Sequence, residues 1–284
     1  MDKIQFFTQA IQDELSKKNI ALPIPSGVAV NLNELLGKED ISYSDISRIA
    51  EKDPSLTAKL LNLANSSYYS GIVRTTTIEQ AVSRIGITGV KNLLMTIIFK
   101  DVFVCKDDYL LKEFEINWQH SLACGLCAQK IAEKVHMSFM AQDAYMLGLL
   151  HDIGVVVILD VLCTLYKRGD ELRLNSRELL EIIYSLHPTA GAMVLGQLKF
   201  NEKICRMVEM HHAPESYCPR DETLFNILLT ADALLKKAGL SLKPNPDISM
   251  SDLPAALVLN ADSGFIAVLE ADIHSLSADM DKLI

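Results

Sequence analysis

Residues 144–166 read AYMLGLLHDIGVVVILDVLCTLY, an apolar run long enough to cross a bilayer as one helix. His151, Asp152 and Asp160 interrupt the run, and ionisable side chains are costly at bilayer depth. We therefore expect a buried helix, or a pair of helices, in a globular core and no membrane span. A carboxylate in such a core is costly unless it is paired, hydrogen-bonded or bound to a cation, so Asp152 is the first candidate functional residue.

Helix signals extend from this run in both directions, whereas strand signals are scarce. Residues 4–15 place their apolar side chains on one stripe of a helix. Pro54 suits a first helical turn, Thr77 can cap a later helix, and Gly86 can end it. The chain is thus predicted to be all-α, with an N-terminal helical lobe packed on a helical bundle. In the helical bundle that forms the second lobe we expect helices near residues 117–135, 141–163, 176–185, 187–198, 201–212 and 221–238.

The charged segment KDDYLLKEFE, residues 106–115, marks the expected boundary between the two lobes. Residues 242–254 are rich in Pro, Ser and Asp, which is typical of a linker. The predicted division is an N-terminal lobe over residues 1–105, a second lobe over 106–240, and a linker with a C-terminal helical tail over 241–284.

Composition indicates a globular protein, with 49% apolar and 22% charged residues. The formal net charge is −9 and no basic run is present, so a nucleic-acid backbone would be repelled. Metal cations or a basic protein partner suit this charge better. The N-terminal segment lacks the pattern of a signal peptide, so we expect a cytoplasmic protein with reduced cysteines. Cys124 and Cys127 form a C-x-x-C that we interpret as small buried helix residues.

Seven residues of the second lobe have side chains typical of a metal site: His120, His151, Asp152, His187, His211, His212 and Asp232. Each also has a structural alternative, since a His beside a helix end or an Asp in a helix bundle often serves only as a hydrogen-bonding group. Their joint occurrence favours one site, because of the seven histidines only His136 and His274 lie outside the set. The same residues could instead form a closed hydrogen-bond network, with Asp152 bonded to a protonated His.

Several stretches resemble the HDOD domain, an HD-related output domain of bacterial signalling proteins, over about residues 20 to 240. The matching stretches are LPIPSGVAVNLNELL (22–36), EKDPSLTAKLLNLANSSYYS (51–70), TIEQAVSRIGITGVKNLLM (77–95), WQHSLACGLCAQKIAE (118–133), AYMLGLLHDIG (144–154), HPTAGAMVLGQLKF (187–200) and HHAP (211–214). The resemblance implies the fold of the HD superfamily of metal-dependent phosphohydrolases, so the second lobe is expected to be an HD-like bundle.

The resemblance also implies a ligand set. The core ligands of the superfamily correspond to His120, the pair His151-Asp152 and Asp232, and dinuclear members add histidines that correspond to His187, His211 and His212. This sequence departs from active relatives in three places. Val155 stands where a Lys often follows the His-Asp pair, the GYP element of cyclic-dinucleotide phosphodiesterases is absent, and Ile116 stands where a bridging Glu is expected.

We therefore expect a signal-transduction output or regulatory domain with an HD-like metal site that holds a divalent ion such as Fe, Mn, Zn, Ni or Mg, or none if the site is vestigial. It would bind a signalling protein partner or a small nucleotide ligand. The alternative is a metal-dependent phosphohydrolase acting on a nucleotide or phosphomonoester, and the sequence leaves enzymatic activity open. Lys203 and Arg206 are the nearest cations before the His pair, although both also fit a solvated helix face.

Overall fold

The computed structural model describes residues 2–17, 42–52, 54–65, 73–102, 107–167, 173–213 and 222–283. The predicted all-α class is confirmed, since 77% of the structure is helical and the described residues contain no strand. The helices are α1 (Lys3–Ser16), α3 (Tyr43–Lys52), α4 (Pro54–Ala64), α5 (Ile78–Val102), α6 (Leu111–Lys134), the short 3-10 helix η1 (Ser138–Met140), α7 (Ala141–Leu150), α8 (Ile153–Lys167), α9 (Ser176–Gln197), α10 (Glu202–Met210), α12 (Thr223–Lys237), α13 (Pro254–Val258) and α14 (Ser263–Leu283).

The chain forms two compact units that differ from the division expected from the sequence. One unit comprises Met1–Leu22 with Cys105–Ser263, and the other comprises Pro23–Val104 with Gly264–Ile284. Helix α1 belongs to the first unit because its apolar stripe packs on α8 and α9. The Phe7 ring is fully buried and lies 5.9 Å from the Tyr166 ring, and Lys3 forms an ion pair of 2.9 Å with Glu178 of α9.

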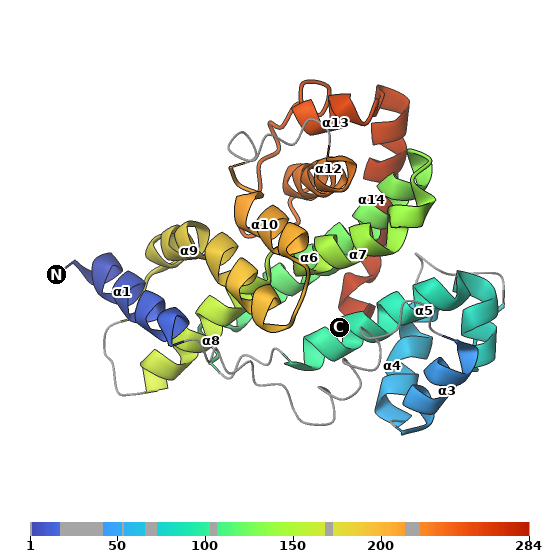
Figure 1. The fold of residues 1–284 in the computed structure, drawn as a ribbon, viewed down its shortest axis with the longest axis horizontal. Helices are drawn as coiled ribbons and strands as arrows, with labels where there is room; N and C mark the ends of the chain where they lie inside the picture. Colours follow the sequence, from blue (N-terminus) through green and yellow to red (C-terminus); the bar gives the residue numbers. More distant parts are fainter. Residues whose placement is uncertain are drawn as a thin grey trace. The chain divides into compact units, whose positions relative to one another are not determined.

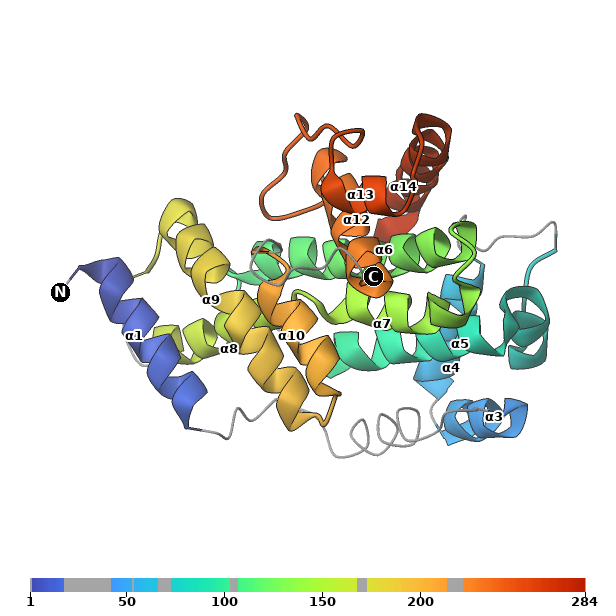
Figure 2. The same cartoon turned by 45° about the horizontal axis from the view of Figure 1, so that its top comes forward.

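Within the first unit, α6 packs against α7 and α12, while α9 packs against α8 and α10 (Figure 1). The pair of α9 and α10 is also visible side by side in the turned view of Figure 2. The contact between α6 and α7 depends on two glycines that face each other. A Cβ atom at Gly125 would lie 2.9 Å from the Tyr145 carbonyl oxygen, and one at Gly148 would lie 2.7 Å from the Cys124 carbonyl oxygen. The two helix backbones therefore approach more closely than any larger residue would allow.

The apolar run at residues 144–166 forms a helix pair, which was one of the two expected outcomes. Helix α7 ends at Leu150, His151 and Asp152 form a turn, and α8 begins at Ile153. By length and composition alone, residues 138–167 and 176–197 could each cross a membrane, but 72% and 50% of their most apolar windows are buried inside the protein. Such burial is typical of core helices. The C-x-x-C at Cys124 and Cys127 is buried in α6 with both thiols reduced, as expected.

The expected helix break at His187-Pro188 is wrong, because α9 runs through Pro188 without interruption. A proline inside a helix costs roughly 3 kcal/mol. Buried residues lie on both sides of it, including Ile183 and Val194, and their packing outweighs this cost. His187 consequently lies in the middle of a rigid helix rather than at a helix start.

The second unit contains α3, α4 and α5, which pack on one another. Thr77 caps α5 as predicted, since its hydroxyl accepts a hydrogen bond of 3.2 Å from the Gln80 backbone N–H. Gly86 has φ 75° and ψ 165° and breaks the helical path within α5, close to the predicted stop. Asn65 has a structural role, because its side chain bonds to both backbone groups of Thr75. Asp53, which precedes Pro54 and is predicted from that position to cap the helix, lies outside the described residues.

Candidate metal centre

All seven residues predicted to form a site converge in the first unit. His120 comes from α6, the pair His151-Asp152 from the turn between α7 and α8, and His187 from the middle of α9. The remaining three are His211 and His212 at the end of α10 and Asp232 on α12. They form two groups, and within each group the potential ligand atoms lie within 4.8 Å of one another: His120, His151 and Asp232 in one, and Asp152, His187, His211 and His212 in the other.

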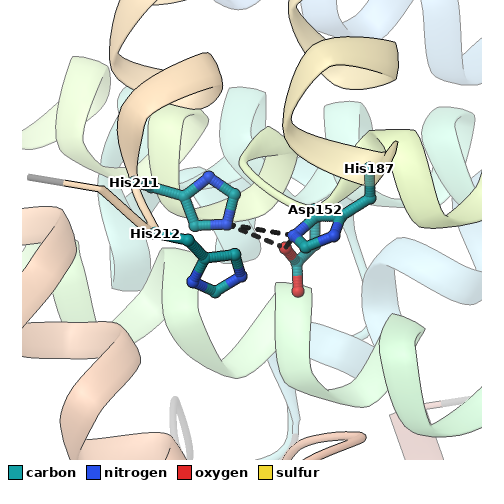
Figure 3. Close-up of side chains that lie close together, drawn as sticks. All are labelled: Asp152, His187, His211 and His212. Carbon is teal, nitrogen blue, oxygen red and sulfur yellow. Dashed lines mark hydrogen bonds and ion pairs between the residues drawn. The ribbon is translucent and has the colours of Figure 1, made fainter. Parts of the chain in front are cut away.

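Asp152 lies between the two groups and faces each with a different oxygen. Its Oδ1 atom lies 3.2 Å from His187 Nε2 and 3.4 Å from His211 Nε2. Figure 3 draws both contacts as dashed lines. Its Oδ2 atom lies 3.6 Å from His120 Nε2 and 3.5 Å from His151 Nε2. One carboxylate is therefore shared by four imidazoles.

Asp232 completes the first group from α12. Its Oδ1 atom lies 3.3 Å from His120 Nε2 and 4.0 Å from His151 Nε2. Its other oxygen accepts a hydrogen bond from the Lys236 ammonium, one helical turn further along α12. The side chain of Asp232 is only 7% exposed, so its charge is balanced inside the protein rather than by water.

The backbone fixes the tautomer of four of these histidines, because each ring places Nδ1 against a carbonyl oxygen. The distances are 2.6 Å from His120 to Leu240, 2.7 Å from His151 to Gly148, 2.8 Å from His187 to Ile183 and 2.6 Å from His211 to Val208. A carbonyl only accepts, so Nδ1 must carry the proton in every ring. In each neutral ring Nε2 is then an unprotonated lone pair that faces the cluster.

These lone pairs face one another at short range. His120 Nε2 and His151 Nε2 are 3.2 Å apart, and the same distance separates His187 Nε2 from His211 Nε2. With both Nδ1 atoms protonated, neither neutral ring of a pair can donate a hydrogen bond to the other. The arrangement is repulsive unless a cation, either a proton or a metal ion, lies between the rings.

The separations resemble those between ligands of one ion. Two atoms that each lie about 2.1 Å from an ion are separated by about 3.0 Å at a right angle and about 3.4 Å at a tetrahedral angle. The Asp152 Oδ1 contacts of 3.2 Å with His187 and 3.4 Å with His211 fit this range, and the Oδ2 contacts of 3.5 Å with His151 and 3.6 Å with His120 lie slightly above it. Charge-assisted hydrogen bonds would be about 2.7–2.9 Å. In addition, the Oδ1 atoms of Asp152 and Asp232 are buried without a hydrogen-bond partner, so each has a lone pair left for a cation.

The surroundings keep both carboxylates ionised. Burial alone would raise the pKa of Asp152, but the imidazoles around it, His151 foremost, hold that pKa well below its usual range. Burial likewise opposes ionisation of Asp232, yet the Lys236 ammonium and the His120 side chain lower its pKa below the ordinary value. Ionised carboxylates are the form that binds a metal ion.

The pKa values of two of the imidazoles shift in opposite directions. Burial lowers the pKa of His151 to about 4, so this ring is neutral at neutral pH and suited to be a ligand. Burial also opposes protonation of His120, but the nearby carboxylates of Asp232 and Asp152 raise the pKa of this ring above its ordinary value. His120 Nε2 therefore lies where a positive charge is strongly stabilised.

A small pocket of about 260 Å³ opens beside the cluster. Its wall includes the segment after α12, which the sequence suggested was part of a linker. The lining residues are His120, Asp152, Val155, Ile183, Tyr184, His187, His212, Lys236, Ser241 and Leu242. Burial, together with the charges of Asp152 and Asp232, raises the pKa of the Tyr184 hydroxyl, which keeps this group protonated.

The cation of the pocket is Lys236, which the sequence interpretation missed. Lys203 instead lies on a solvated face, where it is 57% exposed and pairs with Glu222 at 2.9 Å, and Arg206 does not line the pocket. The spacing of Asp232 and Lys236 could have indicated the pair, since residues four apart meet on one helix face. Val155, which stands where a Lys often follows the His-Asp pair, also lines the pocket. Lys236, on α12 rather than α8, therefore supplies a positive charge to the same pocket.

Comparison with known proteins places this arrangement in a family. Residues 22–214, more than half of the chain, match the HDOD domain family. An uncharacterised protein of Treponema pallidum (strain Nichols) is 25% identical over 231 residues, which cover 78% of this chain and 44% of that relative. The chain thus spans less than half the length of this curated relative.

Solved structures of similar fold come from other bacteria. An HDOD domain protein of unknown function from Geobacter sulfurreducens superposes with a TM-score of 0.74 at 21% identity, covering 99% of both chains. A candidate metal-dependent phosphohydrolase from Shewanella amazonensis SB2B gives 0.72 at 20% identity, covering 99% of this chain and all of that one. A candidate signal transduction protein from Marinobacter aquaeolei VT8 gives 0.63 at 19% identity and is covered over 65% of its length. At these identities the likeness shows a shared fold, and together with the sequence match it follows that the chain belongs to the HDOD domain family.

Proposed function

We propose that this protein is a regulatory, signal-output domain that binds two divalent metal ions at the seven-residue cluster. One observation carries the proposal. Four histidines donate a hydrogen bond from Nδ1–H to a backbone carbonyl, so their four Nε2 lone pairs face two buried carboxylates. One ion would be held by His120, His151 and Asp232, and the other by His187, His211 and His212. Asp152 would offer one oxygen to each ion.

The donor set also bears on which metal binds. Five imidazoles and two carboxylates favour a first-row transition metal such as Fe, Mn, Zn or Ni over Mg, which prefers oxygen ligands. The hydrogen bond from Nδ1 to a backbone carbonyl orients each of these four rings before an ion binds. This orientation raises the affinity of the site for a metal ion.

Phosphoester hydrolysis is the second candidate function, and the presence of Lys236 in the pocket favours it. A bound divalent ion supplies a Lewis acid and lowers the pKa of water. The enclosed part of the pocket is, however, only about 10 Å³, close to the room that one water molecule needs. A nucleotide does not fit inside this space, which favours the regulatory role. As part of this proposal, the domain acts in the cytoplasm on a signalling protein partner.

Metal analysis of the purified full chain tests the proposal. We expect close to two transition-metal ions per chain by inductively coupled plasma mass spectrometry, and loss of metal from both groups in Asp152→Ala because this carboxylate faces both. Asp160→Asn is the matched control, since Asp160 is an exposed carboxylate on α8, outside the cluster. A parent chain without metal, or an Asp152→Ala variant with the metal content of the parent, would contradict the proposal.

A further inference from the structure

His212 is held differently from the other four histidines of the cluster. Those four rings are 1–3% exposed, and each has Nδ1 against a backbone carbonyl. His212 is exposed and makes no hydrogen bond within the described part of the chain. The contacts of the Asp152 carboxylate go to the other four rings, and neither dashed line in Figure 3 leads to His212. Polar contacts therefore do not fix the orientation of this ring.

Aromatic neighbours hold His212 instead. Its ring centroid lies 4.0 Å from that of His211, 4.8 Å from that of His187 and 5.5 Å from that of Tyr184. His187 and His211 are themselves proposed ligands, so Tyr184 is the neighbour that is not a ligand. Tyr184 lies on α9 three residues before His187, and the two rings meet at 5.6 Å and 85°. One tyrosine ring thus contacts two histidines of the same group.

The segment after α12 contacts Tyr184 in turn. The Lys243 ammonium lies 5.1 Å from the centroid of the Tyr184 ring, within the range of a cation–π interaction. The backbone N–H of Lys243 donates a hydrogen bond of 3.2 Å to the Ser241 hydroxyl, which stabilises the turn of this segment. A series of contacts therefore leads from Lys243 through Tyr184 to His212.

We propose that His212 is an exchangeable ligand of the second ion and that Tyr184 is the residue that positions it. The inference rests on the proposed function, because it assigns roles around the proposed second ion. His187, His211 and Asp152 would keep that ion bound while the His212 ring turns away, since their side chains are fixed by the contacts described above.

The orientation of His212 would decide whether the second ion is closed or open. A metal site with four protein ligands is closed, whereas three protein ligands leave a position for water or an external donor. The position that His212 vacates lies toward the pocket, because His212 and Tyr184 both line it. Tyr184 favours the closed arrangement by holding the ring against the cluster.

The visible absorption of cobalt(II) reports its coordination, so the full chain loaded with cobalt tests the inference, with metal content measured on every sample. We expect Tyr184→Leu to keep two ions and to shift the spectrum toward that of His212→Ala. Tyr184→Phe keeps the ring and should match the parent. Tyr109→Leu is the control, because Tyr109 is a 42% exposed tyrosine that contacts Arg173, outside the cluster. A purely structural role of Tyr184 would lower stability without changing the cobalt spectrum.

Added imidazole measures how open the second ion is. In cobalt-loaded Tyr184→Leu, His212 competes less well for its position. This variant should therefore bind imidazole more tightly than the parent by about 10- to 100-fold, the range of effects for residues that orient a metal ligand. His212→Ala should keep the second ion and bind imidazole at least as tightly as Tyr184→Leu, whereas His211→Ala should lose that ion.

The outcomes separate this inference from the proposed function. A parent chain that binds no metal refutes the proposed function, and the exchangeable ligand falls with it. If the parent holds two ions but His212→Ala loses the second as completely as His211→Ala, His212 is a permanent ligand and the exchange is refuted. A parent-like spectrum and imidazole affinity in Tyr184→Leu would overturn the positioning role of Tyr184.

Discussion

Replacement of Gly154 by alanine should damage both the fold and the metal centre. A Cβ atom at this position would lie 2.0 Å from the His187 carbonyl oxygen and 2.6 Å from the Gly191 backbone nitrogen. Ordinary van der Waals contact begins near 3.4 Å, so α8 and α9 would have to separate by about 1.4 Å. Both obstacles are backbone atoms of a long helix and cannot rotate away. Overpacking of this kind costs roughly 1–3 kcal/mol, and we expect the upper end of that range.

The same displacement would reach the site, because Asp152 precedes Gly154 by two residues and lies 3.2 Å from His187 Nε2. Urea unfolding of the full chain, followed by metal analysis, measures both effects. Gly196→Ala is the matched control on α9, since a Cβ there meets nothing within 4 Å and should be neutral or stabilise the helix by up to about 1 kcal/mol. If Gly154→Ala had the unfolding midpoint and metal content of the parent, the account of the α8–α9 contact would be refuted.

Two further predictions concern pH and the second unit. His120 has a raised pKa, so in metal-stripped protein its contribution to stability is complete below its ordinary value of 6.5 and is lost as the pH rises through the raised pKa. The melting temperature of stripped protein should therefore fall as the pH rises above about 6.5 and through the raised pKa of His120, and a slope unchanged in His120→Gln would contradict this assignment. Asn65→Ala removes side-chain bonds of 2.7 Å to the backbone of Thr75 and should lower unfolding free energy by about 1–3 kcal/mol. Metal content should not change in Asn65→Ala, because the cluster lies in the other unit; loss of metal would argue against a purely structural role.

Much of the fold and the membership of the site were predictable from local sequence. The pair His151-Asp152 inside an apolar run indicated a buried polar site, because such a carboxylate requires compensation. Caps and stops such as Thr77 and Gly86 act locally, and the structure has them where the pattern predicts. The geometry that distinguishes a metal site from a hydrogen-bond network was not predictable, since it depends on carbonyls as distant in sequence as Leu240 from His120.

The errors of the sequence interpretation have tertiary causes. Pro188 was expected to start a helix, but packing on both sides keeps α9 continuous. Helix α1 was assigned to the N-terminal lobe by its position in the chain, whereas its apolar stripe packs on α8 and α9. The close approach of the α8 and α9 backbones at Gly154 was not foreseen either. Each of these depends on partners far along the chain, which periodicity does not reveal.

The central claim, a two-ion centre shared by Asp152, is tested most directly by anomalous X-ray diffraction from crystals of the full chain, recorded at the absorption edge of the metal found by mass spectrometry. We predict two anomalous peaks, one about 2.0–2.2 Å from ligand atoms of His120, His151 and Asp232 and the other at similar distances from His187 and His211, with Asp152 between them. Crystals of metal-replete protein without a peak at the cluster, or with peaks only at other places, would contradict the account.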